Sequence, residues 1–167
     1  LVTTTGYAYL FWGPTMLRDT LHTSNAETGW ILGLIAVLCA AGMLLVGASS
    51  DRKRERFFHA AACAIVVSLG CAGAGLLTHP IARMVSLSIA QIAVISFLAP
   101  FWVLPTILLS GTSAAVGIAL VNAIGNIAGF VGPNVVGFLK TRTGGDTGAL
   151  LSLSVMAFVA ALVCVGM

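Results

Sequence analysis

Long apolar runs alternate with short polar clusters along the whole chain. Each run holds about 20 residues, the length of α-helix that crosses the hydrocarbon core of a bilayer at a rise of about 1.5 Å per residue. The charged residues gather in or beside the clusters between the runs. The pattern therefore predicts six membrane-spanning helices, at residues 1–17, 28–48, 57–77, 81–109, 114–139 and 148–167.

Composition supports an all-α, polytopic membrane protein. Hydrophobic residues make up 59% of the chain and charged residues only 8%, whereas soluble domains average about 45–50% apolar and about 25% charged residues. The runs do not alternate in polarity, so a transmembrane β-barrel is excluded. The small net charge of +3 is concentrated in one loop. We therefore expect the lipid bilayer, and not a nucleic acid, as a partner.

The residues that usually carry metal or catalytic chemistry lie in unsuitable places. The four cysteines fall inside apolar runs without metal-ligand spacing. His22, His59 and His79 fall in loops or at span edges, where we expect them to be interfacial. No Ser-His-Asp arrangement and no glycine-rich phosphate loop has a suitable context. We expect no metal, no cofactor and no enzymatic activity.

Orientation rests on the basic residues of the loops. The loop at residues 49–56 holds four, Arg52, Lys53, Arg54 and Arg56, and the opposite side holds four, Arg18, Arg83, Lys140 and Arg142. The positive-inside rule does not decide by this count, and we place the denser loop, 49–56, in the cytoplasm. We expect a multi-pass protein of a bacterial inner (plasma) membrane. The chain does not begin with Met, and we expect a piece of a longer protein.

Two asparagines lie deep in the stretch 97–137, which carries no charge. Asn122, Gly125, Asn126, Gly129 and Pro133 follow spacings of 3, 4, 7 and 11, so they share one face of a helix. Polar residues in a membrane span usually face a bundle interior or a water-filled cavity and indicate a site. For Asn126, a hydrogen bond to another helix is as good an interpretation as substrate contact.

Two further residues, Trp102 and Tyr7, are expected at the same depth in the bilayer as Asn122. If the chain turns near Gly111, both Trp102 and Asn122 lie about 13–17 Å from that turn, near the midplane. Tyr7 reaches a similar depth in its own span. Transporters place substrate sites at the midplane. The alternative for Trp102 and Tyr7 is packing, or an interfacial position.

At the loop after the second span, a G-x-x-x-D-R-x-G-R-R-like pattern is matched by Gly47, Asp51, Arg52 and Arg56. In this the sequence resembles the major facilitator superfamily, whose halves carry such a motif there. Arg54 stands where the motif has glycine. Glu55, in place of an arginine, completes with Ser50 the G-x-x-S-D-R-x-x-E-R form of the anion:cation symporter family. In physical terms, Asp51 can cap a helix or pair with arginine. The alternative is a solvated basic loop at lipid headgroups.

Two further segments are similar to the same anion:cation symporter family. Residues 101–106 match F-W-x-L-P-T, and residues 117–133 match G-I-A-L-x-N-x-x-G-N-x-x-G-F-x-G-P. The Tyr7…Phe11-Trp12-Gly-Pro14-Thr15 pattern is also similar. The resemblance covers essentially the whole chain. It implies that residues 1–167 are the C-terminal six-helix bundle, helices seven to twelve, of a twelve-helix transporter.

The resemblance implies symport of a small organic anion, a carboxylate or sugar acid, usually with H+ as coupling ion, by alternating access. Its partners would be this anion, H+, the bilayer and an N-terminal half. Trp102, Asn122, Asn126 and Tyr7 would bind substrate. Gly125, Gly129 and Pro133 would bend the helix, and Gly47, Asp51, Arg52, Glu55 and Arg56 would form a conformational motif. The alternatives are a passive channel or facilitator, which needs a continuous polar file, and a non-transporting membrane receptor or assembly subunit.

Overall fold

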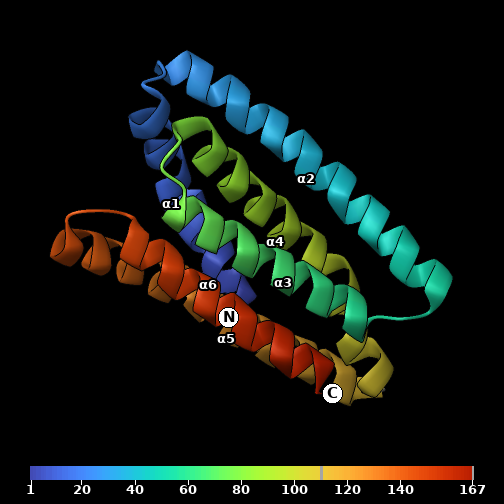
Figure 1. The fold of residues 1–167 in the computed structure, drawn as a ribbon. Helices are drawn as coiled ribbons and strands as arrows, with labels where there is room; N and C mark the ends of the chain where they lie inside the picture. Colours follow the sequence, from blue (N-terminus) through green and yellow to red (C-terminus); the bar gives the residue numbers. More distant parts are fainter. Residues whose placement is uncertain (110, 167) are drawn as a thin grey trace.

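The chain forms a bundle of six α-helices in a computed structural model that describes residues 1–109 and 111–166, without the side chains at 108 and 111–113 (Figure 1). The helices are α1 (Val2–Leu21), α2 (Asn25–Lys53), α3 (Phe57–Leu76), α4 (Pro80–Leu108), α5 (Gly111–Thr143) and α6 (Thr147–Val165). No strand occurs in the described part of the chain. The predicted all-α class is confirmed. Residue 167, where the last expected span ends, lies outside the described residues.

Several helices are longer than the apolar spans that predicted them. α1 continues through Pro14 to Leu21, α2 continues to Lys53, and α5 begins at Gly111, within the expected turn. Apolar runs mark where lipid is crossed, but backbone hydrogen bonding continues into polar residues that also favour helix. Local signals set the actual ends. Ser24 and Glu27 form a reciprocal capping box at the start of α2.

Small residues allow the central helices to approach closely. α3 packs against α4 and α6, α4 also packs against α2, and α1 packs against α5; Figure 1 shows α2 along one edge of the bundle. A Cβ atom added to Gly70 of α3 would come within 2.8 Å of Cβ of Ala90 on α4. Ser154 of α6 donates to the Ser68 carbonyl of α3 at 2.8 Å. Helix association in lipid relies on such close packing and interhelical hydrogen bonds.

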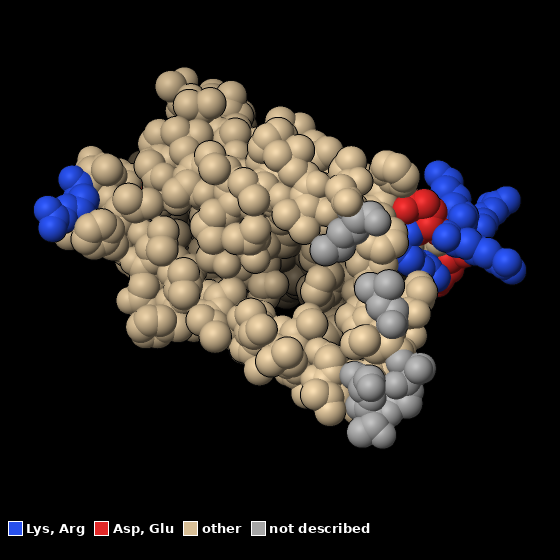
Figure 2. All heavy atoms as spheres, turned by 90° about the horizontal axis from the view of Figure 1, so that it is seen from below, with Lys and Arg blue, Asp and Glu red and all other residues tan. Residues whose placement is uncertain are grey.

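The outer surface is apolar between charged ends. Trp30 and Leu44 of α2 are 82% and 73% exposed, and Figure 2 shows charged side chains at two opposite ends of one face with uncharged surface between them. Five helices, α2 to α6, are long and apolar enough to cross a membrane. α1 falls short because threonines and tyrosines interrupt its apolar residues, and two of them, Thr4 and Thr5, are buried. α1 therefore buries part of its polar surface against its neighbours in the bundle.

Candidate functional site

α1 and α5 meet along a seam of glycine and proline residues. A Cβ atom added to Gly132 would come within 2.5 Å of the Thr4 carbonyl oxygen, so only glycine fits this contact. Further along, Nε1 of Trp12 donates to the Pro133 carbonyl at 3.1 Å. The Lys140 ammonium lies 5.2 Å from the centre of the Trp12 ring. These contacts fix the register of α1 against the polar face of α5.

That register places Tyr7 against the two asparagines. The Tyr7 hydroxyl donates to Oδ1 of Asn126 at 2.6 Å, and Nδ2 of Asn126 donates to Oδ1 of Asn122 at 3.3 Å. We call these three residues the amide chain. Gly129 makes room for the Tyr7 ring, since an added Cβ atom would lie 3.3 Å from Cε1 of Tyr7. Three of the four residues predicted to bind substrate are thus joined by hydrogen bonds.

The amide chain ends in hydrogen-bond donors. A carboxamide has one acceptor oxygen and an NH₂ group with two donors, and the oxygen of Asn122 already accepts from Asn126. Asn122 is exposed, and within the described residues nothing lies within 4 Å of a Cβ atom added at Gly125. The Asn122 end of the amide chain therefore presents N–H groups to an open space. There they can donate to a carboxylate or hydroxyl oxygen.

Trp102 lies outside the amide chain. Its described ring contact is with Phe101, at a centroid distance of 5.4 Å and an angle of 71°, and it is half-buried. Its role in binding stays a prediction, as does helix bending at Gly125, Gly129 and Pro133. The structure gives two of these residues other roles as well. Gly129 makes room for the Tyr7 ring, and the Pro133 carbonyl accepts from Trp12, for which the sequence alone predicted no contact.

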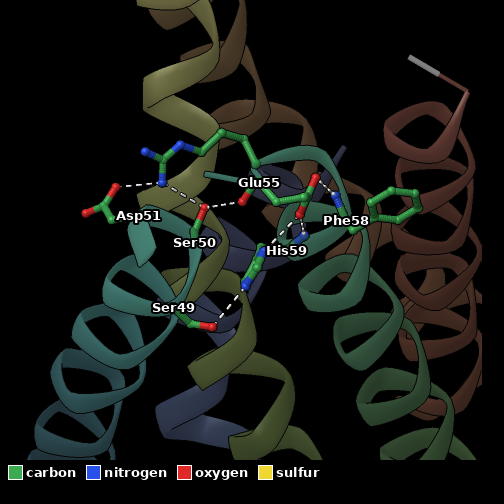
Figure 3. Close-up of polar contacts among 7 residues, drawn as sticks. Ser49, Ser50, Asp51, Glu55, Phe58 and His59 are labelled. Atoms are coloured by element: carbon green, nitrogen blue, oxygen red, sulfur yellow. Dashed lines mark hydrogen bonds and ion pairs between the residues drawn. The ribbon is translucent and has the colours of Figure 1, made fainter. Parts of the chain in front are cut away.

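The last turn of α2 and the residues that connect it to α3 form a closed set of polar contacts (Figure 3). We call this segment, residues 49–56, the motif loop. Asp51 lies 2.6 Å from Nη1 of Arg56, and the same nitrogen donates to the Ser50 hydroxyl at 2.9 Å. The Ser50 hydroxyl donates to the Glu55 carbonyl at 2.5 Å. Of the two roles considered for Asp51, the structure shows the pairing with arginine. Ser50 is fully buried and connects both ends of the loop.

Glu55 caps the next helix. Its carboxylate accepts from the backbone N–H groups of Phe58 at 2.8 Å and His59 at 3.1 Å, at the start of α3 (Figure 3). Partial desolvation acts to raise the pKa of Glu55, but hydrogen bonds from Phe58 and His59 outweigh it, so the pKa is lowered. A glutamate in place of the family's arginine therefore has a structural reason here, since it satisfies free N–H groups of α3.

His59 is not a simple interfacial residue. Its Nδ1 lies 2.9 Å from Glu55, and its Nε2 lies 3.1 Å from the Ser49 hydroxyl (Figure 3). The spacing of four residues between Glu55 and His59 could have indicated the first contact. The second depends on how the loop turns. This row of contacts ties the end of α2 to the start of α3.

The turn itself occurs at Arg54, which has φ 52° and ψ 34°, in the left-handed region. This is the position where the family motif has glycine, the residue that adopts positive φ without steric cost. In this chain, Arg54 ends α2 and starts the turn towards α3. Gly47, one helical turn before Asp51, lies against Ala99 of α4, and Arg52 is exposed.

No group of three or more His, Cys, Asp or Glu side chains among the described residues could hold a metal ion. At the end of the bundle away from the motif loop, Asp146 lies 3.0 Å from Lys140 and 3.6 Å from Arg83. Arg83 also donates to the Ala74 carbonyl at 2.7 Å. This charge cluster joins the ends of α3, α4, α5 and α6. We therefore give it a structural role, which is to hold these helix ends together.

Comparison with known proteins gives the family. The sequence model of the Major Facilitator Superfamily matches residues 1–133. A protein of Agrobacterium vitis named "Putative tartrate transporter" is 32% identical over 94% of this chain and 36% of its own length. The "Quinolone resistance transporter" of Acinetobacter baumannii is 33% identical over 93% of the chain and 36% of its length.

The "Inner membrane transport protein RhmT" of Escherichia coli is 33% identical over 94% of the chain and 37% of its length. The chain thus spans about a third of the length of these curated relatives. No solved structure matches it. The family match over most of the chain, together with the identities of these relatives, shows that the chain belongs to the Major Facilitator Superfamily.

Proposed function

We propose that residues 1–167 are the C-terminal six-helix bundle, helices seven to twelve, of a secondary transporter that moves a small organic anion by alternating access. Two lines of argument support this. The motif loop lies between the second and third helices of this bundle, where each half of the family's fold carries one. The relatives that match nearly all of this chain are named as transporters, one of them for tartrate, an organic anion.

The amide chain is the observation that supports an organic anion as the substrate. Tyr7 orients Asn126, Asn126 orients Asn122, and the chain ends in unengaged N–H donors on an exposed face of α5. Leaving such a face in hydrocarbon is costly, so it suits a water-filled cavity between two halves of a transporter. A carboxylate or sugar hydroxyl would replace that water. Trp102, at similar expected depth, would offer an aromatic wall.

The motif loop would act in the conformational cycle and not in binding. Its Asp51–Arg56 ion pair is exposed on the Asp51 side, where the side chain is 69% accessible. Such a pair adds little to stability but can exchange partners when the halves rock. We propose that H+ is the coupling ion. We also propose that the protein lies in a bacterial inner membrane with loop 49–56 in the cytoplasm; the bacterial relatives support this.

Transport by the full-length protein in proteoliposomes tests the proposal, with radiolabelled tartrate as the probe. We expect accumulation against a gradient that an imposed inward proton gradient drives and a protonophore abolishes. Asn122→Ala is expected to weaken tartrate binding at least severalfold. Asn134→Ala is the matched control, because Asn134 is also exposed on α5 but donates to the Phe130 carbonyl of its own helix at 2.6 Å. Equal binding by the two variants would contradict the site. Equilibration without accumulation would instead favour a facilitator.

Orientation needs a separate test. Cysteines introduced at Lys53 and at Asp19 lie at opposite ends of the bundle and are both exposed. An impermeant thiol reagent added to intact cells is expected to label the cysteine at Asp19 and not the one at Lys53. The reverse result would place loop 49–56 outside the cell.

A further inference from the structure

A small cavity lies inside the bundle, away from the amide chain. Its volume is about 10 Å³, and α1, α4, α5 and α6 line it. Most of its wall is apolar, but Thr5 and Tyr9 of α1 and Gln91 of α4 also line it. Thr5 and Tyr9 are four residues apart and therefore share one face of α1.

Each of these three polar residues has a buried oxygen without a partner. Oγ1 of Thr5, the hydroxyl of Tyr9 and Oε1 of Gln91 form no hydrogen bond within the described part of the chain. Thr5 as a whole is only 3% exposed. The Tyr9 hydroxyl lies near Ser88, whose own hydroxyl donates to the Met84 carbonyl at 2.8 Å. Buried polar groups in folded proteins are nearly always paired, with protein or with ordered water.

We propose that Thr5, Tyr9 and Gln91 hold one buried water molecule in this cavity. The volume agrees with the roughly 10–15 Å³ that a water needs by this measure, and three partners is the typical number. The hydrogen-bond inventory also balances. The water donates to Oε1 of Gln91 and to one hydroxyl, and it accepts from the other hydroxyl. Each of the three oxygens then has a partner.

A metal cation fits this cavity less well than water. Hard cations take about six to eight oxygen ligands at Ca²⁺ sites, usually with carboxylates among them. The cavity offers three neutral oxygens, and the carboxylates of the chain, at Asp19, Glu27, Asp51, Glu55 and Asp146, fall at the ends of helices or in loops. Gln91 also borders an open cavity of about 250 Å³ that reaches Tyr7, which gives water a route in.

The water adds a polar link between α1 and α4. α1 bonds to α5 through Tyr7 and Trp12. Gly6 of α1 lies against Val94 of α4 by apolar contact. A water bonded to both helices therefore helps to fix α1 against α4 at the centre of the bundle. This inference does not depend on the proposed transport function.

Radiolytic hydroxyl-radical footprinting of the full-length protein in H₂¹⁸O tests the proposal, because radicals form at bound water and modify adjacent side chains. We expect Tyr9, which is half-buried and whose hydroxyl oxygen is buried, to be modified, and the double variant Thr5→Val/Gln91→Leu to lose at least severalfold of that modification. Phe97, a buried aromatic residue, reports general unfolding, since its modification would then rise. Thr4→Val is the matched control: Thr4 is equally buried but faces Gly132 of α5, so Tyr9 modification should not change.

Three outcomes would overturn the proposal: no modification of native Tyr9, modification that persists undiminished in the double variant, or a Na⁺- or K⁺-dependent rise in thermal midpoint that Thr5→Val removes. The last would assign the cavity to a cation. If the double variant does not fold, the single variant Thr5→Val is used instead. It replaces one polar group of the cavity wall by a methyl group and leaves the water two partners. A partial loss of Tyr9 modification in that single variant supports the site, and unchanged modification contradicts it.

Discussion

The Tyr7 hydroxyl donates a hydrogen bond of 2.6 Å to Oδ1 of Asn126, a residue that lies 119 positions further along the chain. The bond fixes which way the Asn126 amide faces, because its oxygen is the acceptor for Tyr7 and its nitrogen is left to donate to Asn122. A residue that need not touch the substrate can therefore decide how Asn122 meets it.

The first prediction concerns Tyr7→Phe. The variant keeps the ring over Gly129 but loses the hydroxyl, so Asn126 is free to turn its amide over. A single hydrogen bond contributes about 0.5–1.5 kcal/mol, so we expect the substrate dissociation constant of the full-length protein to rise about 2- to 13-fold. Isothermal titration of tartrate onto the purified protein measures this. An unchanged constant would show that the orientation of Asn126 does not matter for binding.

The second prediction concerns Arg54→Gly. Arg54 is exposed and holds a left-handed backbone conformation with φ 52°. That conformation costs an L-residue about 1–2 kcal/mol, partly offset by the greater chain entropy that glycine loses on folding. We expect a gain in stability of about 0.5–1 kcal/mol. Lys53→Gly, one residue earlier and still within α2, is the control and should destabilise by up to about 1 kcal/mol. Denaturant unfolding in detergent compares the two; equal losses would contradict the backbone argument.

The third prediction concerns Asp51→Asn. The substitution removes the charge that faces Arg56 but leaves an amide of the same shape. We expect turnover in proteoliposomes to fall severalfold, with the substrate dissociation constant unchanged, because Asp51 belongs to the loop and not to the amide chain. Asp19→Asn is a matched control, since Asp19 forms an exposed ion pair with Arg18 at 3.4 Å at the other end of the bundle. A large loss of affinity in Asp51→Asn with normal turnover would count against a conformational role.

The fourth prediction follows from the lowered pKa of Glu55. Because the folded protein favours the charged carboxylate, the stabilisation is complete above the ordinary carboxyl pKa of about 4.3 and is lost as the pH falls through the lower folded pKa. Glu55→Gln removes this contribution. The stability difference between wild type and variant should therefore be largest near neutral pH and should shrink in acid. A difference that stays constant as the pH is lowered would show that the carboxylate charge does not stabilise the start of α3.

Much of the fold follows from the sequence because the signals that set it are local and strong. Apolar runs of spanning length predicted all six helices, and the helical spacing of Asn122 and Asn126 predicted their common face. The choice between interhelical bonding and substrate contact at Asn126 could not be made from spacing. It depends on the register of α1 against α5, which the contact between Thr4 and Gly132 sets.

Other features depend on how distant segments meet. The Ser49–His59 contact requires the turn at Arg54, and a left-handed arginine has no sequence signature. Thr5, Tyr9 and Gln91 look unremarkable in the sequence, since a threonine, a tyrosine and a glutamine can each face a neighbouring helix or a headgroup. Their importance appears only when α1 and α4 bring the three residues to the wall of one cavity and leave their oxygens without a partner.

The last prediction concerns charge. An organic anion held near the midplane needs a positive partner, and proton coupling needs an acid there. Every charged residue of this chain lies at a helix end or in a loop, and several are already paired: Asp51 with Arg56, and Asp146 with Lys140 and Arg83. The amide chain is neutral and ends in donors, so it can orient an anion without balancing its charge. We therefore expect both the counter-charge and the proton carrier to come from the other half of the full-length protein.

Measurement of the proton-to-substrate ratio in proteoliposomes checks this. Asp146→Asn and Glu55→Gln should each leave the ratio unchanged even where they reduce stability or rate, because neither carboxylate lies among the proposed binding residues. The 167-residue chain alone should bind tartrate far more weakly than the full-length protein, while Asn134→Ala leaves the full-length affinity intact. Loss of proton coupling in Asp146→Asn or Glu55→Gln would place the proton carrier in this bundle. If the isolated chain bound tartrate as tightly as the full-length protein, the amide chain would bind an anion without a counter-charge.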